Sequence, residues 1–591
     1  MPGKGVGEFE FLDRQWRRWL LLLWVIVAGY MLFDRWPLIR IFALGDTDDN
    51  MRIMQVRALL AGQNWYDLAQ HRLAGSNIHW SRLVDLPIAG LKLAFTPLLG
   101  GRIAEQIAVA VAPLLPMGVT MAAIAVTVRR LVAPLAYPLA IALLVTAGST
   151  NGMFQPLRID HHGWQLAMLA WAMASLTDAR RMRGGITLGI ATALSLVIGM
   201  EMLLYLAVAG TIAVLMWVRD REESRRLFAY GVSLAGGCSL GYLVFASRAN
   251  SGPVCDALSP VWLSAMVVAG AVAILLAMKS PATRWGRFAA AAAAGLAVAG
   301  AFALAWPHCL GRLEQSTPEL DRLWLSKVRE AMPIWRHGME TTILTVTLPV
   351  FGLIGYAMML WRERRDPARM IPWAAIAALA ALAAALLCWQ TRAGPAAQLL
   401  SIAGVTALAW FTIQWVMGLK YMLARVFGVA AAFLFISGIA ANYLSPQFFR
   451  APLSQTRRTV NIANNRCPTL AALAPIARQP RGMVMTFVDL GPRLIAVTPH
   501  DAITGPYHRN GSQIIDVMHA WRGDAANALR TARKYHADYV LICPNLSEST
   551  IYRAEAPGGF YMQLMANKVP HWLQTVPLPT NSPYRMWRVV G

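Results

Sequence analysis

The sequence predicts an α-helical polytopic membrane protein with a soluble C-terminal α/β domain. The chain has 591 residues, of which 57% are hydrophobic and only 14% are charged. Apolar runs of about 20 residues, the length that spans a bilayer, recur along most of the chain. Short clusters of Arg and Lys separate these runs, as is typical of cytoplasmic anchors. The net charge of +23 therefore reflects membrane topology, and we find no signal for nucleic-acid binding.

The first apolar run, about residues 19–33, predicts a span that is retained in the mature protein. Three arginines precede this run and no small-residue cleavage site follows it directly. We therefore expect the N-terminus in the cytoplasm. Residues 65–82 mix aromatic and polar side chains, which is typical of a segment that lies in the membrane interface.

A polar stretch, residues 44–52, follows the first span and contains Asp46, Asp48 and Asp49. Carboxylates clustered beside a membrane can hold a divalent cation or take a proton from an acceptor hydroxyl. The structural alternative is that Thr47 or one Asp caps a helix that Gly62 would end. A cap needs one such residue and the stretch offers four, which favours the functional interpretation.

The length of the apolar stretch at residues 186–218 decides the topology of the chain. It is too long for one ordinary span, and basic clusters flank both of its ends, which predicts two crossings. The tip of this hairpin would lie near Glu201, at the same membrane face as Asp48 and Asp160. A single helix would instead bury Glu201 in the membrane, which is costly.

The other spans are predicted from the same pattern of apolar runs between basic clusters, and bring the total to about thirteen crossings. Their approximate bounds are residues 103–128, 134–147, a fourth that ends before Arg180, 228–246, 261–278, 288–306, 341–360, 371–389, 399–417 and 426–443. An odd number of crossings places the C-terminus outside the cytoplasm.

The composition changes after residue 443, so we divide the chain into a membrane domain, residues 1–443, and a soluble domain, residues 444–591. The soluble part contains strand-like runs at residues 484–488 and 539–543 and a helix-like run at residues 525–536. This mixture predicts an α/β domain, which the topology places in the periplasm.

Three polar clusters are predicted to converge on one membrane face. Carboxylates from separate loops can bind a divalent ion, or one of them can act as a general base while Arg or His neutralises a departing phosphate. An alternative for the histidines is a backbone hydrogen bond at a span end, and Arg392 could instead be a snorkelling anchor. The residues concerned are Asp46, Asp48, Asp49, Arg158, Asp160, His161, His162, Glu201 and, on a further loop, Arg392.

Four of the six cysteines fall in segments that the topology places in the oxidising periplasm. Because they group by neighbouring loops and by domain, we predict a pair Cys467 with Cys543 and a pair Cys255 with Cys309. The alternative for Cys543 is a buried free thiol at the end of a strand. The other two, Cys238 and Cys388, lie in apolar runs and are predicted to be buried.

These residues resemble those of the GT-C class of membrane glycosyltransferases, which includes oligosaccharyltransferases, protein O-mannosyltransferases and the aminoarabinose transferases of lipid A. The resemblance covers the architecture of nearly the whole chain: an acidic loop after the first span, a second loop with Asp and His after the third, and a C-terminal domain. It rests on Asp46-Thr47-Asp48-Asp49-Asn50-Met51-Arg52, Arg158-Ile159-Asp160-His161-His162, Glu201 and Arg392. The Trp-Trp-Asp signature of oligosaccharyltransferases is absent, which argues against protein N-glycosylation.

The resemblance implies transfer of a sugar from a polyprenyl-phosphate donor to a hydroxyl of a glycan, lipid or protein at the periplasmic face of a bacterial inner membrane. Inversion at the anomeric carbon follows if one base drives direct displacement. A Mg²⁺ or Mn²⁺ ion is optional in this class. The implied roles are catalysis by Asp48 or Asp49 with Asp46 beside them, acceptor or metal binding by Asp160, His161, His162 and Glu201, and phosphate binding by Arg392, Arg52 and Arg158.

Two other functions are compatible with a polytopic chain. A transporter or flippase of lipid-linked sugars would be favoured by charges at the bilayer midplane and by inverted repeats, whereas here the charges lie at one face and we find no repeat. A non-catalytic factor of glycan assembly could also keep such a scaffold. The sequence gives no indication of the oligomeric state.

Overall fold

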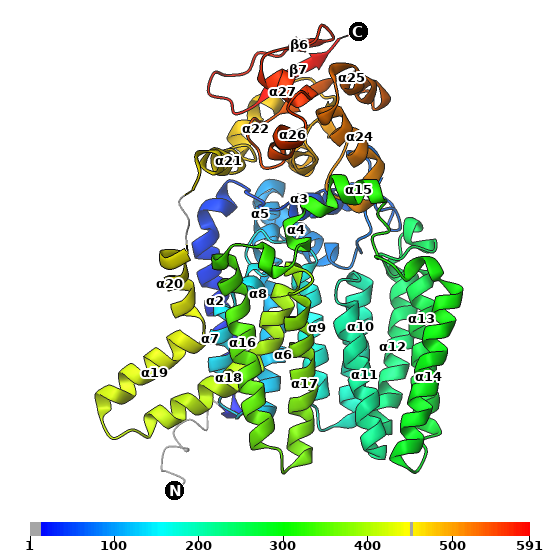
Figure 1. Cartoon of the computed structure of the whole chain (residues 1–591), viewed down its shortest axis with the longest axis vertical. Coiled ribbons are helices and arrows are strands. Elements are labelled where there is room, and N and C mark those ends of the chain that lie inside the picture. Colours follow the sequence, from blue (N-terminus) through cyan, green and yellow to red (C-terminus); the bar gives the residue numbers. More distant parts are fainter. Residues whose placement is uncertain (1–12, 450–452, 591) are drawn as a thin grey trace.

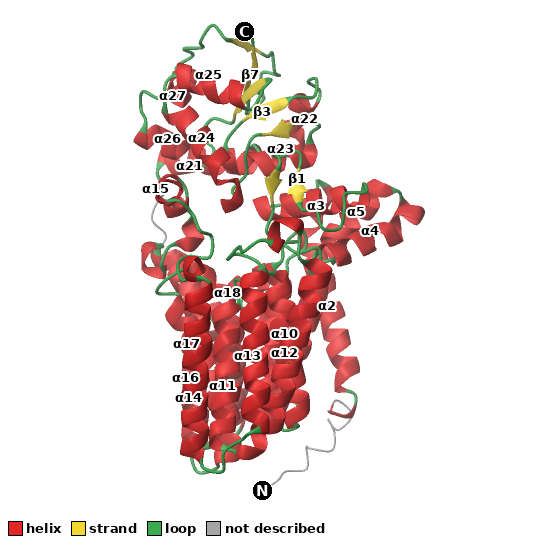
Figure 2. Cartoon of the chain, turned by 90° about the vertical axis from the view of Figure 1, so that its right-hand side faces the viewer, coloured by secondary structure: helices red, strands yellow, loops and turns green. Residues whose placement is uncertain are grey.

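The computed structural model of the protein describes residues 13–449 and 453–590. A bundle of long, roughly parallel helices carries a smaller domain with strands and short helices at one end (Figure 1). Figure 2 shows that the strands gather in this second domain, whereas the bundle is helical throughout. The predicted architecture, a polytopic helical membrane domain followed by an α/β domain, is confirmed.

Within the described residues, nine helices are long and apolar enough to cross a bilayer. α19 (Met422–Ile436) and α20 (Ile439–Phe449) meet at a bend of 64° and bring the number to ten if the pair is counted as one broken span. The nine are α2 (Trp16–Arg40), α5 (Gly101–Val111) with α6 (Leu114–Leu131), α10 (Arg181–Ile198), α12 (Ser224–Phe245), α13 (Pro260–Met278), α14 (Arg284–Ala305), α16 (Met339–Arg362), α17 (Pro367–Leu386) and α18 (Gly394–Met417).

This number is smaller than the thirteen crossings expected from the sequence, because three of the expected spans are short helices. They are α7 (Tyr137–Thr146), α9 (His162–Leu176) and α11 (Leu203–Arg219), with 10, 15 and 17 residues. Helices that span a bilayer have about 17 to 25 residues. The apolar runs were therefore located correctly, but α7 and α9 are shorter than a full span and α11 is at the lower limit.

The predicted hairpin at residues 186–218 is confirmed as α10 and α11, with its tip at residues 199–202. The close approach of α10 to α12 depends on glycine: a Cβ atom at Gly185 would overlap the backbone oxygen of Arg226. A similar contact joins α16 to α18, where a Cβ at Gly355 would overlap the backbone oxygen of Gly404. Small residues at such crossings let membrane helices pack backbone against backbone.

A layer of short elements separates the bundle from the C-terminal domain (Figure 2). It contains α3 (Thr47–Leu60), the two-stranded ribbon β1 (Ala69–Gln70) and β2 (Ser76–Asn77), α4 (Asp85–Leu99), α8 (Gly148–Gly152) and α15 (Pro318–Leu323). α5, which was counted with α6 as one apolar stretch by length and composition, lies beside α4 in this layer (Figure 2). Residues 65–82, predicted to lie in the interface, form this ribbon and its flanking turns.

The C-terminal domain is built on a five-stranded mixed sheet with the strand order β4-β3-β5-β7-β6. β3 pairs in parallel with β4 and β5, whereas β7 pairs antiparallel with β5 and β6. The strands are β3 (Met483–Met485), β4 (Asp501–Ala502), β5 (Tyr539–Ile542), β6 (Leu573–Thr575) and β7 (Arg585–Val589). The helices are α21 (Gln455–Arg466), α22 (Leu470–Ala477), α23 (Gly491–Val497), α24 (Gly511–Arg522), α25 (Ala525–Lys534), α26 (Ser549–Glu555) and α27 (Phe560–Met565).

Both predicted disulfides are present. Cys467 pairs with Cys543, and Cys255 pairs with Cys309 across 54 residues of sequence. Cys238 is buried, as expected, but Cys388 is exposed because it lies in the turn beyond the end of α17, outside the helix packing.

The C-terminal domain is held against the layer that contains the acidic stretch. Tyr507 donates a hydrogen bond to the backbone oxygen of Thr47 at 3.0 Å, and Arg493 donates one to Asn50 at 3.1 Å. The guanidinium of Arg72 pairs with Asp501 at 2.9 Å. These contacts place the C-terminal domain directly over the first turn of α3.

Candidate functional site

The acidic stretch forms the beginning of α3, and Asp46 caps this helix. The Asp46 carboxylate accepts hydrogen bonds from the backbone N–H of Asp48 at 3.2 Å and from the Thr47 hydroxyl at 3.1 Å. The capping alternative is therefore right for Asp46. It leaves Asp48 and Asp49 to be explained, because one cap satisfies the end of the helix.

Asp49 is buried and holds the second loop in place. Its Oδ1 accepts hydrogen bonds from the backbone N–H groups of Ile159 at 2.8 Å and of Asp160 at 3.1 Å, and its side chain is 1% exposed. Since a carboxylate with these partners fixes the backbone at residues 158–160, Asp49 is placed to order the site and not to meet a substrate.

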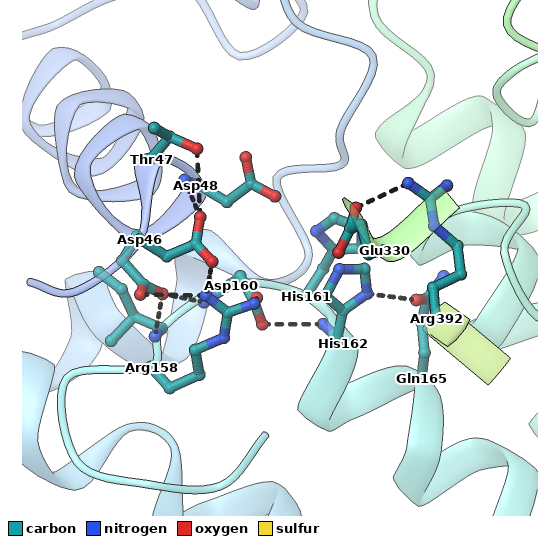
Figure 3. Close-up of polar contacts among 12 residues, drawn as sticks. Asp46, Thr47, Asp48, Arg158, Asp160, His161, His162, Gln165, Glu330 and Arg392 are labelled. Atoms are coloured by element: carbon teal, nitrogen blue, oxygen red, sulfur yellow. Dashed lines mark hydrogen bonds and ion pairs between the residues drawn. The ribbon is translucent and has the colours of Figure 1, made fainter. Parts of the chain in front are cut away.

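Arg158 joins the two loops by contacting three carboxylates (Figure 3). Its guanidinium pairs with Asp46, with Asp49 at 3.4 Å and with Asp160 at 2.7 Å. Burial opposes its charge, but the three carboxylates outweigh burial and raise the pKa of Arg158 above its ordinary value. With its donors engaged in these pairs, Arg158 mainly neutralises the cluster.

Asp48 points away from this network. Within the described part of the chain its carboxylate has no hydrogen-bond donor, and it lies near Asp160 and His162, with one ligand atom of each residue within 4.8 Å of the others. Burial, followed by the charges of Asp46 and Asp160, raises the pKa of Asp48 well above its ordinary value. Asp48 is thus the carboxylate of the stretch that is available to a proton, a cation or a substrate.

Glu201 and His161 form a second pair at the same face. His161 Nε2 lies 2.8 Å from Glu201 Oε1, and the Gln165 amide donates to the other oxygen. Burial disfavours the ionised carboxylate, but the charge and hydrogen bond of His161 outweigh it and hold the pKa of Glu201 well below its usual range. The ring of His161 also contacts Trp80, with centroids 5.4 Å apart. The predicted convergence of the three loops is therefore observed.

Arg52 does not reach the open part of the site. Its side chain is 1% exposed, pairs with Asp85 at 2.8 Å and lies over the ring of Trp80 at 4.5 Å. Trp80 in turn contacts the ring of His161. Arg52 therefore stabilises the position of Trp80, and Trp80 stabilises the position of His161. The structure therefore separates Arg52 from the residues that can meet a donor phosphate.

Arg392 lies across the site from Asp48, in the turn before α18, and pairs with Glu330 at 2.7 Å (Figure 3). Glu314 lies 4.0 Å away. Glu330 belongs to the loop that links α14 to α16, and its charge also acts on the Asp48 carboxylate. Glu330 therefore lies between Arg392 and Asp48, and its charge acts on both (Figure 3).

Four residues of this region were not found from the sequence: Trp80, Glu330, Tyr507 and Asp489. Asp489 follows β3 in the C-terminal domain, where burial and then the charge of Asp46 raise its pKa to about 6. Behind it, Glu548 accepts hydrogen bonds from the N–H groups of Val488 at 3.0 Å and Asp489 at 2.8 Å. A carboxylate directly after a predicted strand was the one available signal for Asp489.

The residues present fit a divalent cation. Asp48, Asp160 and His162 each bring one ligand atom within 4.8 Å of the others, and so do His161, His162 and Glu201. Asp160 Oδ2 is buried and, apart from its ion pair with Arg158, has no hydrogen-bond donor among the described residues. Carboxylates with one imidazole are ligands that Mg²⁺, Mn²⁺ and Zn²⁺ accept.

No protein-family model matches the chain, and no curated protein matches it. Among solved structures, the archaeal oligosaccharyltransferase AglB from Archaeoglobus fulgidus, in complex with an inhibitory peptide and a dolichol-phosphate, has a TM-score of 0.64 and 14% identity over 95% of this chain and 73% of that chain. The Archaeoglobus fulgidus oligosaccharyltransferase in complex with Zn and sulfate has a TM-score of 0.59 and 15% identity over 96% and 73%. ArnT from Cupriavidus metallidurans bound to undecaprenyl phosphate has a TM-score of 0.41 and 13% identity over 96% and 97%.

At these identities the similarity to the oligosaccharyltransferase structures concerns the fold. The chain shares the fold of these oligosaccharyltransferase structures, with a helical membrane domain and a C-terminal domain on one face, which agrees with the fold that the resemblance in sequence implied.

Proposed function

We propose that this protein is a membrane glycosyltransferase that moves a sugar from a polyprenyl-phosphate donor to an acceptor hydroxyl at the outer face of the membrane. The observation that carries this proposal is the pair of groups on either side of Glu330: a carboxylate without a hydrogen-bond donor among the described residues, Asp48, and a guanidinium, Arg392 (Figure 3). One can take a proton from an acceptor while the other neutralises a departing phosphate. The GT-C fold adds support, since a neighbour of that fold is described in complex with dolichol-phosphate.

In this proposal Asp48 is the general base. It accepts the proton of the acceptor hydroxyl as that oxygen attacks the anomeric carbon and the phosphate leaves from the opposite side, so the product is inverted. Asp49 and Arg158 are positioning residues, because they hold the two loops together without facing the open space.

Arg392 is the residue we assign to the donor phosphate. It is about twice as exposed as Arg158, with 38% of its side chain exposed against 18%, and its main partner is one glutamate on a neighbouring loop. A phosphate could replace Glu330, because a guanidinium binds either anion in the same geometry. Arg52 is enclosed and Arg158 is shared by three carboxylates, so neither is part of this assignment.

Asp48, Asp160 and His162 would hold a divalent metal ion if the enzyme uses one. Bound there, the ion would compensate the carboxylates and supply positive charge beside the reacting oxygens. The Asp160 carboxylate is oriented in either case, since its Oδ1 accepts a hydrogen bond from the backbone N–H of His162 at 3.1 Å.

The experiment that tests this function is a transfer assay on the purified full-length protein with a labelled polyprenyl-phosphate sugar and a panel of glycan, lipid and peptide hydroxyl acceptors. We expect a new glycoside of inverted configuration, with turnover at least about a hundredfold lower in Asp48→Asn, as for loss of a general base. The matched control is Asp516→Asn, a carboxylate on the far surface of the C-terminal domain that pairs with Lys534. An equal loss of turnover in both variants, or no loss of turnover in Asp48→Asn, contradicts the assignment of Asp48 as the general base.

A further inference from the structure

A second group of metal-ligating side chains lies outside the acidic site, where three distant parts of the chain meet. His79 follows β2, Asp256 lies in the loop between α12 and α13, and His508 precedes α24 in the C-terminal domain. One ligand atom of each residue lies within 4.8 Å of the other two. None of the three has a role in the proposed transfer reaction.

Two of these side chains are held firmly. Asp256 is next to the disulfide-bonded Cys255, and its carboxylate pairs with Arg509 at 2.6 and 2.7 Å. His508 Nε2 lies 2.5 Å from Asp256 Oδ2, and its ring is 4.7 Å from the ring of His79. A hydrogen bond to a carboxylate from outside the ligand set, as Arg509 provides, is typical of metal centres.

His79 supplies an independent indication of a missing ligand. Its Nδ1 is buried and has no hydrogen-bond partner among the described residues. Its backbone oxygen accepts a hydrogen bond from the Asn250 amide at 3.3 Å, which holds the backbone at this residue. An unpartnered buried ring nitrogen is costly and uncommon, and a bound ion would relieve that cost.

We propose that His79, Asp256 and His508 form a binding site for a divalent transition metal of the zinc type. Two imidazoles and one carboxylate are a ligand set that zinc accepts, whereas magnesium and calcium prefer oxygen ligands throughout. Ligand atoms around a tetrahedral zinc ion are about 3.3 Å apart, so small side-chain movements close this group around an ion.

The charge of the surroundings is compatible with a cation. Asp256 is one carboxylate at the site, and the charge of Glu201 also acts on His79. These two carboxylates outnumber the guanidinium of Arg509. The ion would join two loops of the membrane domain to the C-terminal domain, so this site fixes the domain over the face that carries Asp48.

The test is metal binding by the full-length protein, first stripped with a chelator and then titrated with Co²⁺, whose absorption reports nitrogen ligands, and with Zn²⁺ counted by elemental analysis. We expect His79→Gln and His508→Gln each to lose about one metal equivalent per chain and the matching cobalt band. The amide of the His508→Gln variant can still donate a hydrogen bond to Asp256, so the contact between these two segments is retained. His519→Gln is the control, since His519 is a partly exposed histidine of the same domain and pairs with Glu319 of α15.

A zinc-dependent rise in the melting temperature provides a second measurement. Zinc should stabilise the wild type and the His519→Gln control but neither His79→Gln nor His508→Gln, since an ion that binds only the folded chain raises its stability. The site is refuted if the wild type binds no zinc, if all variants bind as the wild type does, or if His162→Gln alone loses the metal and its stabilisation.

Discussion

Neighbouring carboxylates on one helical turn have different chemical environments in this protein. Asp46 caps α3, Asp49 binds two backbone N–H groups of the facing loop, and Asp48 has no donor among the described residues. Their order in sequence gives no hint of this division, because it depends on what lies opposite each side chain. Burial without a donor makes Asp48 a strong proton acceptor.

The two aspartates should respond differently to substitution. Asp49→Asn replaces an acceptor of two backbone N–H groups and should lower the stability by about 1–3 kcal/mol. Asp48→Asn should not lower it at neutral pH. The pKa of Asp48 is raised in the folded protein, so its contribution to stability is present at low pH and lost as the pH rises, and Asn resembles the protonated form. Thermal melts in detergent measure both, and a larger loss in Asp48→Asn would reverse the two roles.

The pH dependence of turnover follows from the same carboxylate. A general base acts in its ionised form, and the pKa of Asp48 lies well above the ordinary carboxyl value, so the rate should rise with pH through that higher pKa and then level off. The profile of kcat/KM against pH checks this. An activity that is already constant from the ordinary aspartate pKa upwards would show that a different group accepts the proton.

The sequence predicted the membership of the site better than the role of each member. Asp48, Asp160, His162 and Glu201 were chosen because the topology brings their loops to one face, and the structure places them together. Arg52 was grouped with the phosphate ligands by its position in the stretch. Its burial against Asp85 and Trp80 depends on contacts between elements, which spacing along the chain does not contain.

Among the elements, the segment between α14 and α16 connects the parts of the site. It begins at the Cys255–Cys309 disulfide, contacts the C-terminal domain through Lys327 and Glu555 at 2.6 Å, and reaches Arg392 through Glu330. Glu330 accepts a hydrogen bond from Arg392, so in the proposed reaction a donor phosphate would compete with Glu330 for this guanidinium. On that proposal this segment would set the affinity for the donor.

Glu330→Gln should lower the KM for the polyprenyl-phosphate donor several-fold, because a neutral amide competes less well than a carboxylate for Arg392. The kcat should change less, since Glu330 does not accept the proton in this account. Initial rates at varied donor concentration measure both. Glu340→Gln, a glutamate further along the same segment at the start of α16, is the control. A large fall in kcat for Glu330→Gln would instead place Glu330 among the catalytic residues.

The disulfides can be tested at the same scale. Peptide mapping of protein that has never met a reductant should recover Cys467 linked to Cys543 and Cys255 linked to Cys309. The second bridge fixes the loop that carries Asp256, so the variant with Cys255→Ala and Cys309→Ala should melt at a lower temperature. Recovery of all four as alkylated free thiols would contradict the pairing and the oxidising compartment assigned to this face.

The prediction of membrane spans was least accurate where an apolar run of the sequence forms a helix of fewer than about 18 residues. The apolar runs at α7, α9 and α11 were found, but hydropathy does not show where a helix ends against its neighbours. α9 begins at His162 because residues 158–161 are held by Asp49, which is a tertiary contact. The domain boundary set at residue 443 lies inside α20, which continues to Phe449.

At the scale of the whole molecule, the site lies between the membrane domain and the C-terminal domain. Asp48 and Arg392 come from the first, whereas Tyr507 and Asp489 come from the second, above the start of α3. The ionisable groups of the site gather at this one face, and the contacts across it would oppose the alternating movement that a transporter requires. The arrangement therefore favours chemistry at a fixed face.

The central claim is that the protein transfers a sugar and does not merely move its carrier lipid. The most direct test uses proteoliposomes that contain either the wild type or Asp48→Asn. They carry a labelled polyprenyl-phosphate sugar, and the acceptor is either enclosed or external. We expect label in the acceptor with the wild type when donor and acceptor share the leaflet that faces the C-terminal domain, and at least about a hundredfold less with Asp48→Asn. Movement of the label between leaflets without any transfer, at equal rates in both proteins, would contradict the claim.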